Sequence, residues 1–402
     1  MKVFMVFGTR PEAIKMAPVV RAIDGADGLD GVVCVTAQHR EMLAQVLKVF
    51  DITPQYDLDI MTEGQDLFDI TTKSLSGLRN ILGMEEPEIV LVQGDTTTAF
   101  AASLAAYYSK IAVGHVEAGL RTYDKLSPFP EEGMRHLIGV LADYHFAPTK
   151  RAMSNLLKEG VSKENIWLTG NTVVDALFHV RGRQDASGSG AEWERYFEEK
   201  WNLSCPSRFG DDGGRLVLVT GHRRESFGEG FENICMALKE IAERRRNVSI
   251  VYPVHLNPNV QGPVRRILGG QPNIYLIDPL DYEPFVYLMS RCYLVLTDSG
   301  GIQEEAPSIG KPVLVMRQKT ERPEGVEAGT VKLVGTDKEK IVKETFRLFD
   351  DASLYERMST AVNPYGDGRA AERIVEVLEE RVLEDLRSGA ERPARDRTKL
   401  GV

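Results

Sequence analysis

The chain has 402 residues, of which 43% are hydrophobic and 27% are charged, and its formal net charge is −10. This length predicts two domains rather than one hydrophobic core, and the composition is typical of a globular protein. Because binding to nucleic acid needs a basic surface, the acidic balance excludes nucleic acid as a general partner, but it is compatible with a small anionic ligand held by local cations.

The start of the chain and its cysteines indicate where the protein works. The sequence opens directly on a strand-like run, without a signal peptide or transit peptide, and no apolar run reaches membrane-spanning length, so we expect a cytoplasmic protein that does not bind membranes. The four cysteines are scattered, with no Cys-x-x-Cys pair. Cys34 and Cys292 lie inside apolar strand-like runs, which predicts buried free thiols.

Apolar, β-rich runs alternate with amphipathic helical stretches, such as residues 11–23 and 231–242, along the whole chain. The predicted strands of the first half are residues 3–7, 32–35, 89–92, 111–113, 145–147 and 166–168. Those of the second half are residues 216–219, 249–251, 274–277, 293–296, 313–315 and 331–334. This alternation predicts two doubly wound α/β domains, each with a parallel sheet covered by helices on both faces, rather than one barrel.

The composition changes between residues 181 and 214, where glycine-rich segments flank a polar helical stretch. We place the hinge near residues 170–174, which predicts a first domain at 1–172 and a second at 173–364. The charged segment 387–402 has no periodicity and is predicted to be a disordered tail.

Ligands of open parallel sheets bind beyond the carboxyl ends of the strands, and the first predicted strand ends in Gly-Thr-Arg-Pro-Glu at residues 8–12. Thr9 can cap the following helix and Pro11 suits its first turn. Arg10 and Lys15 then stand near a helix start, where cations are unfavourable unless an anion is present. They indicate an anion site; the alternative is a solvated helix start.

Two carboxylates follow neighbouring predicted strands. Asp95 comes after residues 89–92 and Glu117 after residues 111–113, so we expect both at the rim of one sheet. Each alone could be a helix cap. Together, and near two cations, they indicate separate acid and base groups.

Glu131 and Arg135 lie four residues apart on a predicted helix, which two prolines, Pro128 and Pro130, approach rigidly. The pair could form only a surface salt bridge. Its rigid placement after Glu117 favours a role in substrate binding.

In the second domain, His222 and Arg223 follow the strand at 216–219 and suit phosphate contact or proton transfer. His255 follows the next predicted strand. These histidines lie on separate loops, and neither a His-Glu-x-x-His motif nor a cysteine pair occurs, so no metal is expected. Neither a Gly-x-Gly-x-x-Gly nor a Walker loop occurs, so neither a nicotinamide cofactor nor ATP is indicated, and we expect an enzyme without a cofactor.

The most informative segment is Thr-Asp-Ser-Gly-Gly-Ile-Gln-Glu-Glu at residues 297–305. A strand that ends at Ser299, Gly300 and Gly301 and continues as a helix offers free backbone N–H groups, and glycines let a diphosphate approach closely. Glu305, about one turn further on, could accept hydrogen bonds from ribose hydroxyls. The alternative is a tight turn without a ligand.

These motifs resemble those of the non-hydrolysing UDP-N-acetylglucosamine 2-epimerases, in order and from residue 1 to about 385. The segments that carry the resemblance are residues 8–15, 94–98, 114–121, 127–132, 220–225, 252–258, 297–307, 320–324 and 363–368. The resemblance implies a GT-B fold, in which two Rossmann-like domains face a central cleft, the first on the sugar side with the catalytic carboxylates and the second binding UDP. It also implies a helix at 365–386 that crosses back to the first domain.

The resemblance further implies a homodimer that interconverts UDP-GlcNAc and UDP-ManNAc without a cofactor, for cell-surface polysaccharide. In the family mechanism, UDP is eliminated in the anti sense to give 2-acetamidoglucal and is then added back in the syn sense. The alternatives are a hydrolysing epimerase that releases ManNAc and UDP, a GT-B glycosyltransferase, and a non-catalytic nucleotide-sugar sensor.

Carried over by position, the resemblance makes Asp95, Glu117 and Glu131 the acid and base candidates and places His222 beside the diphosphate. The other implied substrate contacts are Arg10, Lys15, Arg135, Phe285, Ser299, Gly300, Gly301, Glu305 and Arg322. Among the positions that depart from the family pattern, Gln93 stands where many members have histidine, and Leu280 stands where some have a glutamine at the uracil.

Overall fold

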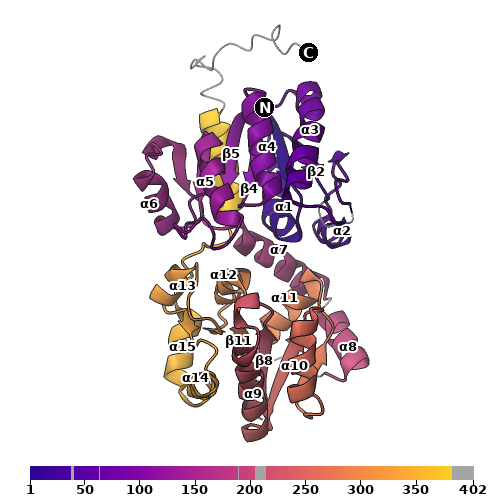
Figure 1. The fold of residues 1–402 in the computed structure, drawn as a ribbon, viewed down its shortest axis with the longest axis vertical. Helices are drawn as coiled ribbons and strands as arrows, with labels where there is room; N and C mark the ends of the chain where they lie inside the picture. The colour runs from indigo at the N-terminus through magenta and orange to yellow at the C-terminus, as the bar shows by residue number, and fades with distance from the viewer. Residues whose placement is uncertain (38–39, 63, 189, 204–213, 383–402) are drawn as a thin grey trace. The chain divides into compact units, whose positions relative to one another are not determined.

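The computed structural model describes residues 1–37, 40–62, 64–188, 190–203 and 214–382. The chain divides into two compact units (Figure 1), which we call unit 1, Met1–Ala176 with Gly366–Val402, and unit 2, Leu177–Tyr365. The predicted tail at 387–402 lies outside the described residues.

Unit 1 is built on a seven-stranded sheet in the order β3-β2-β1-β4-β5-β6-β7, and every strand pair in it is parallel. Its strands are β1 (Lys2–Phe7), β2 (Asp30–Val35), β3 (Tyr56–Asp57), β4 (Ile89–Gln93), β5 (Ala112–Val116), β6 (Tyr144–Ala147) and β7 (Ile166–Leu168). The central strands are apolar and fully buried because helices cover both faces of a parallel sheet.

The helices of unit 1 are α1 (Arg10–Asp24), α2 (Arg40–Val49), α3 (Leu67–Glu85), α4 (Thr97–Tyr108), α5 (Glu131–Leu141), α6 (Lys150–Lys158) and α16 (Ala370–Val377). Helices α3, α4 and α5 pack side by side and share a hydrophobic core with the sheet, to which they contribute Leu78, Ala102 and Ile138 among others. Helix α1 packs against α2 and α16.

Unit 2 has a six-stranded sheet in the order β10-β9-β8-β11-β12-β13, again with only parallel pairs. Its strands are β8 (Arg215–Thr220), β9 (Val248–Pro253), β10 (Ile274–Ile277), β11 (Leu294–Thr297), β12 (Val313–Val315) and β13 (Val331–Leu333). Its helices are α8 (Gly190–Trp201), α9 (Glu229–Arg244), α10 (Pro258–Leu268), α11 (Tyr282–Arg291), α12 (Gly300–Ser308), α13 (Pro323–Glu327), α14 (Lys338–Asp350) and α15 (Ala352–Thr360).

The predicted doubly wound α/β class is confirmed, and each predicted strand coincides with an observed one within a few residues. The sequence did not predict β3, because two residues are too few to show a period. Cys34 and Cys292 are buried free thiols, as expected.

Both sheets reverse their strand order at one place, and this decides where the polar loops meet. In unit 1 the reversal falls between β1 and β4, and in unit 2 between β8 and β11. Ligands of open α/β sheets bind at such switch points. The loops that begin at Gly8 and Gly94, and those that begin at Gly221 and Asp298, therefore lie at the expected ligand positions.

Helix α7 (Thr172–Ser187) begins in unit 1 and ends in unit 2, and the chain returns to unit 1 at Gly366. The return is tied down by Asp175 of α7, whose Oδ1 accepts a hydrogen bond of 2.8 Å from the Ala371 N–H at the start of α16. Arg373 adds a bond of 2.9 Å to the Thr169 carbonyl oxygen.

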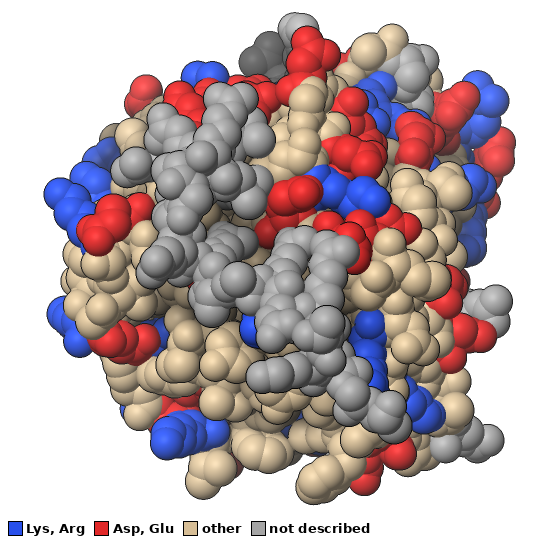
Figure 2. All heavy atoms as spheres, turned by 90° about the horizontal axis from the view of Figure 1, so that it is seen from above, with Lys and Arg blue, Asp and Glu red and all other residues tan. Residues whose placement is uncertain are grey.

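Two features of the structure bear on expectations drawn from the composition: the distribution of charged side chains on the surface and the apolar character of the helices. On the face shown in Figure 2, the acidic and basic side chains of the described residues are interspersed rather than gathered into one basic patch. No helix within the described ranges has the length and apolar character needed to cross a membrane.

Candidate active site

The loop after β1 is fixed by a capping box. Thr9 is the N-cap of α1, as expected, and the Glu12 side chain returns to accept from the Gly8 and Thr9 N–H groups at 3.1 and 2.7 Å. The other carboxylate oxygen of Glu12 accepts from the Thr96 hydroxyl at 2.6 Å. Glu12 is buried, and its carboxylate therefore joins the loop after β1, which leads to Arg10, to the loop after β4, which contains Asp95.

Glu117 is held in an unusual conformation at the end of β5. Its backbone φ angle is 66°, in the left-handed region that residues other than glycine rarely adopt. The carboxylate is buried and forms an ion pair with the Lys15 ammonium group, and Asn171 Nδ2 donates to Oε2 at 2.8 Å. An added Cβ at Gly94 would lie 3.9 Å from Glu117 Oε1. The loops after β4 and β5 therefore lie next to each other, as expected. Lys15, which was expected to face an anion, forms its ion pair with Glu117.

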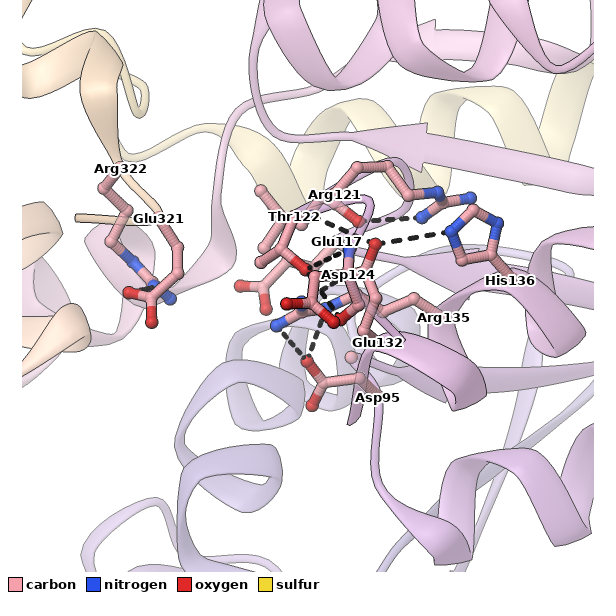
Figure 3. Close-up of polar contacts among 12 residues, drawn as sticks. Asp95, Glu117, Arg121, Thr122, Asp124, Glu132, Arg135, His136, Glu321 and Arg322 are labelled. Atoms are coloured by element: carbon pink, nitrogen blue, oxygen red, sulfur yellow. Dashed lines mark hydrogen bonds and ion pairs between the residues drawn. The ribbon is translucent and has the colours of Figure 1, made fainter. Parts of the chain in front are cut away.

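Asp95 forms the second ion pair of this edge. Arg135 Nε and Nη2 reach Asp95 Oδ2 at 2.8 and 2.7 Å, and Arg135 Nη1 reaches Glu132 Oε2 at 2.9 Å (Figure 3). The ion-pair partners of Arg135 are thus Asp95 and Glu132. This differs from the alternative of a surface salt bridge between Arg135 and Glu131. Burial lowers the pKa of Arg135, but the two carboxylates outweigh it and leave that pKa raised.

Glu131 differs from the other two carboxylates. It is the first residue of α5, and its Oε2 is buried without a hydrogen-bond partner among the described residues. A buried acceptor of this kind has room for a proton or a ligand donor.

Glu132 and His115 were not predicted, yet both position this edge. Glu132 is completely buried, and its Oε1 accepts from the Thr122 and Tyr123 N–H groups at 3.0 and 2.8 Å (Figure 3). His115 Nε2 lies 2.7 Å from the Gly94 carbonyl oxygen. Burial lowers the pKa of His115 to about 3, so the ring is neutral and donates through Nε2. The sequence feature that could have indicated Glu132 is the pair of adjacent glutamates, Glu131 and Glu132, at the start of a helix.

Among the residues expected in unit 2, His222 lies directly after β8. Its side chain is 43% exposed and stacks on His255, with ring centroids 5.2 Å apart and planes at 12°. Burial has the largest effect on the pKa of His222 and lowers it. The Asp298 charge, which is next in effect, raises this pKa, and His255 and Arg223 lower it again, so that it is lowered overall.

The start of α12 has the geometry expected of an anion seat. Ser299 is the N-cap, and no side chain caps the helix there. A Cβ added at Gly300 would lie 2.6 Å from Arg322 Nη1, so only glycine lets the guanidinium group rest on the helix start. Arg322 Nε in turn donates to the buried Glu304 at 2.5 Å. Gly301 follows and is half buried.

Glu305 of α12 contacts α11, the helix that also carries Phe285. The Tyr282 hydroxyl, at the start of α11, donates to Glu305 Oε2 at 3.0 Å. Phe285 is one turn further along α11 and half buried. Tyr282 was not predicted, although its place three residues before Phe285 could have suggested it.

A row of alternating charges, which sequence reasoning also missed, supports Arg322. Arg317 is 6% exposed at its side chain and bonds Glu225 at 2.5 Å and Glu321 at 2.8 Å. Burial alone would raise the pKa of Glu321, but the two neighbouring arginines lower it to about 2.

The predicted site residues thus form two sets. Unit 1 holds what we call the carboxylate set, which consists of three carboxylates and the three cations expected near them: Asp95, Glu117 and Glu131 with Arg10, Lys15 and Arg135. Unit 2 holds an anion-binding set whose members are His222, Phe285, Ser299, Gly300, Gly301, Glu305 and Arg322. No cluster of metal-ligating side chains occurs among the described residues.

Two parallel sheets, each with polar groups at its switch point, place the chain in the class of α/β proteins with a GT-B-like fold. The crystal structure of a glycosyltransferase from Rickettsia africae shares this fold alone, with a TM-score of 0.62 at 14% identity over 96% of this chain and 99% of that one.

More specific comparisons identify the family. The family model "UDP-N-acetylglucosamine 2-epimerase" matches residues 21–379. The UDP-N-acetylglucosamine 2-epimerase of Escherichia coli K12 is 58% identical over 94% of this chain and 98% of its own, and that of Campylobacter jejuni is 56% identical over 94% and 97%. The structure of UDP-GlcNAc 2-epimerase from Neisseria meningitidis, bound to UDP-GlcNAc, gives a TM-score of 0.86 at 50% identity over 94% of this chain and 100% of that one.

The chain belongs to the UDP-N-acetylglucosamine 2-epimerase family. It is an epimerase that acts on UDP-GlcNAc and forms UDP-ManNAc, and the resemblance inferred from the motifs is confirmed.

Proposed function

We propose that the chain epimerises UDP-GlcNAc by eliminating UDP and adding it back. In the anti elimination, a base takes the C2 proton, the C1–O bond breaks with its electron pair leaving on UDP, and a C1=C2 double bond forms in 2-acetamidoglucal. In the syn addition, C2 is protonated from the opposite face and the UDP oxygen returns to C1. No oxidant and no water is consumed.

The observation that carries this proposal is the carboxylate set of unit 1. Proton transfer on opposite faces of C2 needs more than one acid–base group. Asp95 and Glu117 are each held in place by a cation, whereas Glu131 has a buried oxygen open to a donor. The carboxylates therefore differ in their environment, as separate acid and base roles require.

The unit 2 set supports a second role, retention of UDP. Free N–H groups at the start of α12 and the Arg322 guanidinium group suit a diphosphate, Glu305 suits the ribose, and Phe285 suits the uracil. We propose His222 as a further contact to the departing diphosphate. The Neisseria relative was solved with UDP-GlcNAc bound, which supports the same ligand here.

Arg10, Lys15 and Arg135 complete the proposed substrate contacts on unit 1. Lys15 and Arg135 act by keeping Glu117 and Asp95 oriented. Arg10, at the first position of α1, brings a positive charge to the switch point. We further propose that the product supplies ManNAc-type sugars for cell-surface polysaccharide.

A homodimer is part of the proposal. Helices α3, α4 and α5 are neighbours (Figure 1) and expose Phe68, Tyr108 and Val140 by 81, 62 and 84%. We propose that a second copy covers this face. Val140→Glu should lower the mass measured by light scattering from dimer to monomer, while Val362→Glu, at an equally exposed valine of unit 2, should not. A monomeric wild type would refute the dimer.

The proposed mechanism is tested by an NMR time course with UDP-GlcNAc in D₂O. We expect UDP-ManNAc to form with deuterium at C2 in both epimers. Product without deuterium would refute proton exchange with solvent at C2. Free ManNAc and UDP as the products would identify a hydrolysing epimerase instead, and transfer of the sugar to an added acceptor would identify a glycosyltransferase.

A further inference from the structure

Asp298 is a buried carboxylate that none of the proposed roles uses. It follows β11 and directly precedes Ser299, and none of its surface is exposed. Its Oδ2 accepts hydrogen bonds from the backbone N–H groups of His222 at 2.7 Å and Arg223 at 2.8 Å. Strands β8 and β11 are neighbours, with Thr220 opposite Thr297. Asp298 therefore ties the loop that carries His222 to the strand that leads into the diphosphate seat.

The second oxygen of Asp298 faces His222. Oδ1 is buried and has no hydrogen-bond partner within the described part of the chain, and it lies 3.6 Å from His222 Nδ1. The backbone bonds alone would leave this oxygen unsatisfied, which is unfavourable for a buried anion. A proton on His222 Nδ1 could be donated to Asp298 Oδ1 after a small movement of the ring, because the two atoms are 3.6 Å apart.

The charges around His222 pull in opposite directions. Burial, His255 and Arg223 disfavour the protonated ring, and Asp298 favours it. A neutral imidazole next to a departing diphosphate donates at most one hydrogen bond, whereas the charged ring also attracts the anion. The Asp298 carboxylate opposes these effects and favours the charged ring, although the pKa of His222 stays lowered overall.

We propose that Asp298 is a positioning residue for His222: it fixes the loop through two backbone N–H groups, and its charge holds the ring in the doubly protonated form, in which Nδ1 faces Asp298 and Nε2 donates a hydrogen bond to the diphosphate of UDP. No covalent step is involved. The inference rests on the proposed contact between His222 and UDP.

The experiment is a double-mutant cycle of Asp298→Asn and His222→Asn, with kcat and the affinity for UDP measured at several pH values. Asparagine keeps an oxygen for the backbone N–H groups but loses the charge. We expect Asp298→Asn to lower kcat roughly 10-fold and to cause no further loss in the His222→Asn background.

The pH profile separates positioning from a purely structural effect. Because the proposal requires the protonated ring, kcat should fall as pH rises through the pKa of His222, and in Asp298→Asn this fall should begin at lower pH. His255→Asn is the matched control: it removes a neighbour that lowers the pKa of His222, so it should move the fall to higher pH. An unchanged profile in both variants would overturn the inference.

Two further outcomes are decisive. Equal losses from Asp298→Asn with and without His222 would show that Asp298 acts independently of the ring, while full activity of His222→Asn would refute the proposed role of His222 itself. If Asp298→Asn does not fold, ¹⁵N NMR of the wild-type enzyme with UDP bound still decides, because a neutral His222 ring, with only one of its two nitrogens protonated, contradicts the proposal.

Discussion

The switch points of the two units are built alike but carry different chemistry. In unit 1, Glu12 in the first turn of α1 reaches the loop after β4, and in unit 2, Asp298 after β11 reaches the loop after β8. Each is a buried carboxylate that binds backbone N–H groups. Around them, unit 1 collects carboxylates paired with cations, and unit 2 collects free N–H groups and arginine. We therefore propose that the same scaffold serves proton transfer in one unit and anion retention in the other.

The largest effect should come from the unit 1 carboxylates. Asp95→Asn, Glu117→Gln and Glu131→Gln each remove a proposed acid–base group, so we expect kcat to fall by roughly 10² or more while the affinity for UDP stays within about two-fold of wild type. Turnover assays and calorimetric UDP titrations measure both quantities. Wild-type turnover in all of these variants would remove the chemical role from unit 1.

The next effect should come from the seat in unit 2. Gly300→Ala places a Cβ 2.6 Å from Arg322 Nη1 and should push the guanidinium group away from the helix start. We expect UDP to bind on the order of 10-fold more weakly, about the contribution of one charge-assisted contact. Gly262→Ala in α10, where a Cβ meets nothing within 4 Å, is the matched control and should bind UDP normally. An undisturbed affinity in Gly300→Ala would contradict the seat.

A paired test compares the anchors of the two arginines. Glu132 holds Arg135 and Glu304 holds Arg322, and both carboxylates are completely buried. We expect Glu132→Gln to lower kcat several-fold and Glu304→Gln to weaken UDP binding several-fold, each with a loss of about 1–3 kcal/mol in stability. If both variants changed the same kinetic quantity, the division of labour between the units would be wrong.

The smallest effect concerns stability at low pH. The pKa of Glu321 is lowered to about 2 from 4.5, so its stabilising contribution is complete above about 4.5 and is lost as pH falls towards 2. The difference in melting temperature between wild type and Glu321→Gln should be constant from neutral pH down to about 5 and then shrink. A difference that grew on acidification would show that the Glu321 carboxylate does not stabilise unit 2 as an anion.

The sequence alone determined the strands, the doubly wound class and the family, because the period and burial of a parallel strand are local properties that each segment displays by itself. It also predicted the loops of the candidate site, since polar residues after an apolar run mark the strand ends at which ligands bind.

The tertiary structure decided which charges meet. Arg135 was expected to act with Glu131, four residues away, but it bonds Asp95 from a distant part of the sequence. The anchoring roles of Glu12, Glu132 and Asp298 also emerged only there. The physical reason is that the partner of a buried carboxylate depends on which loops the strand order brings together, and adjacent residues in the chain carry no record of that.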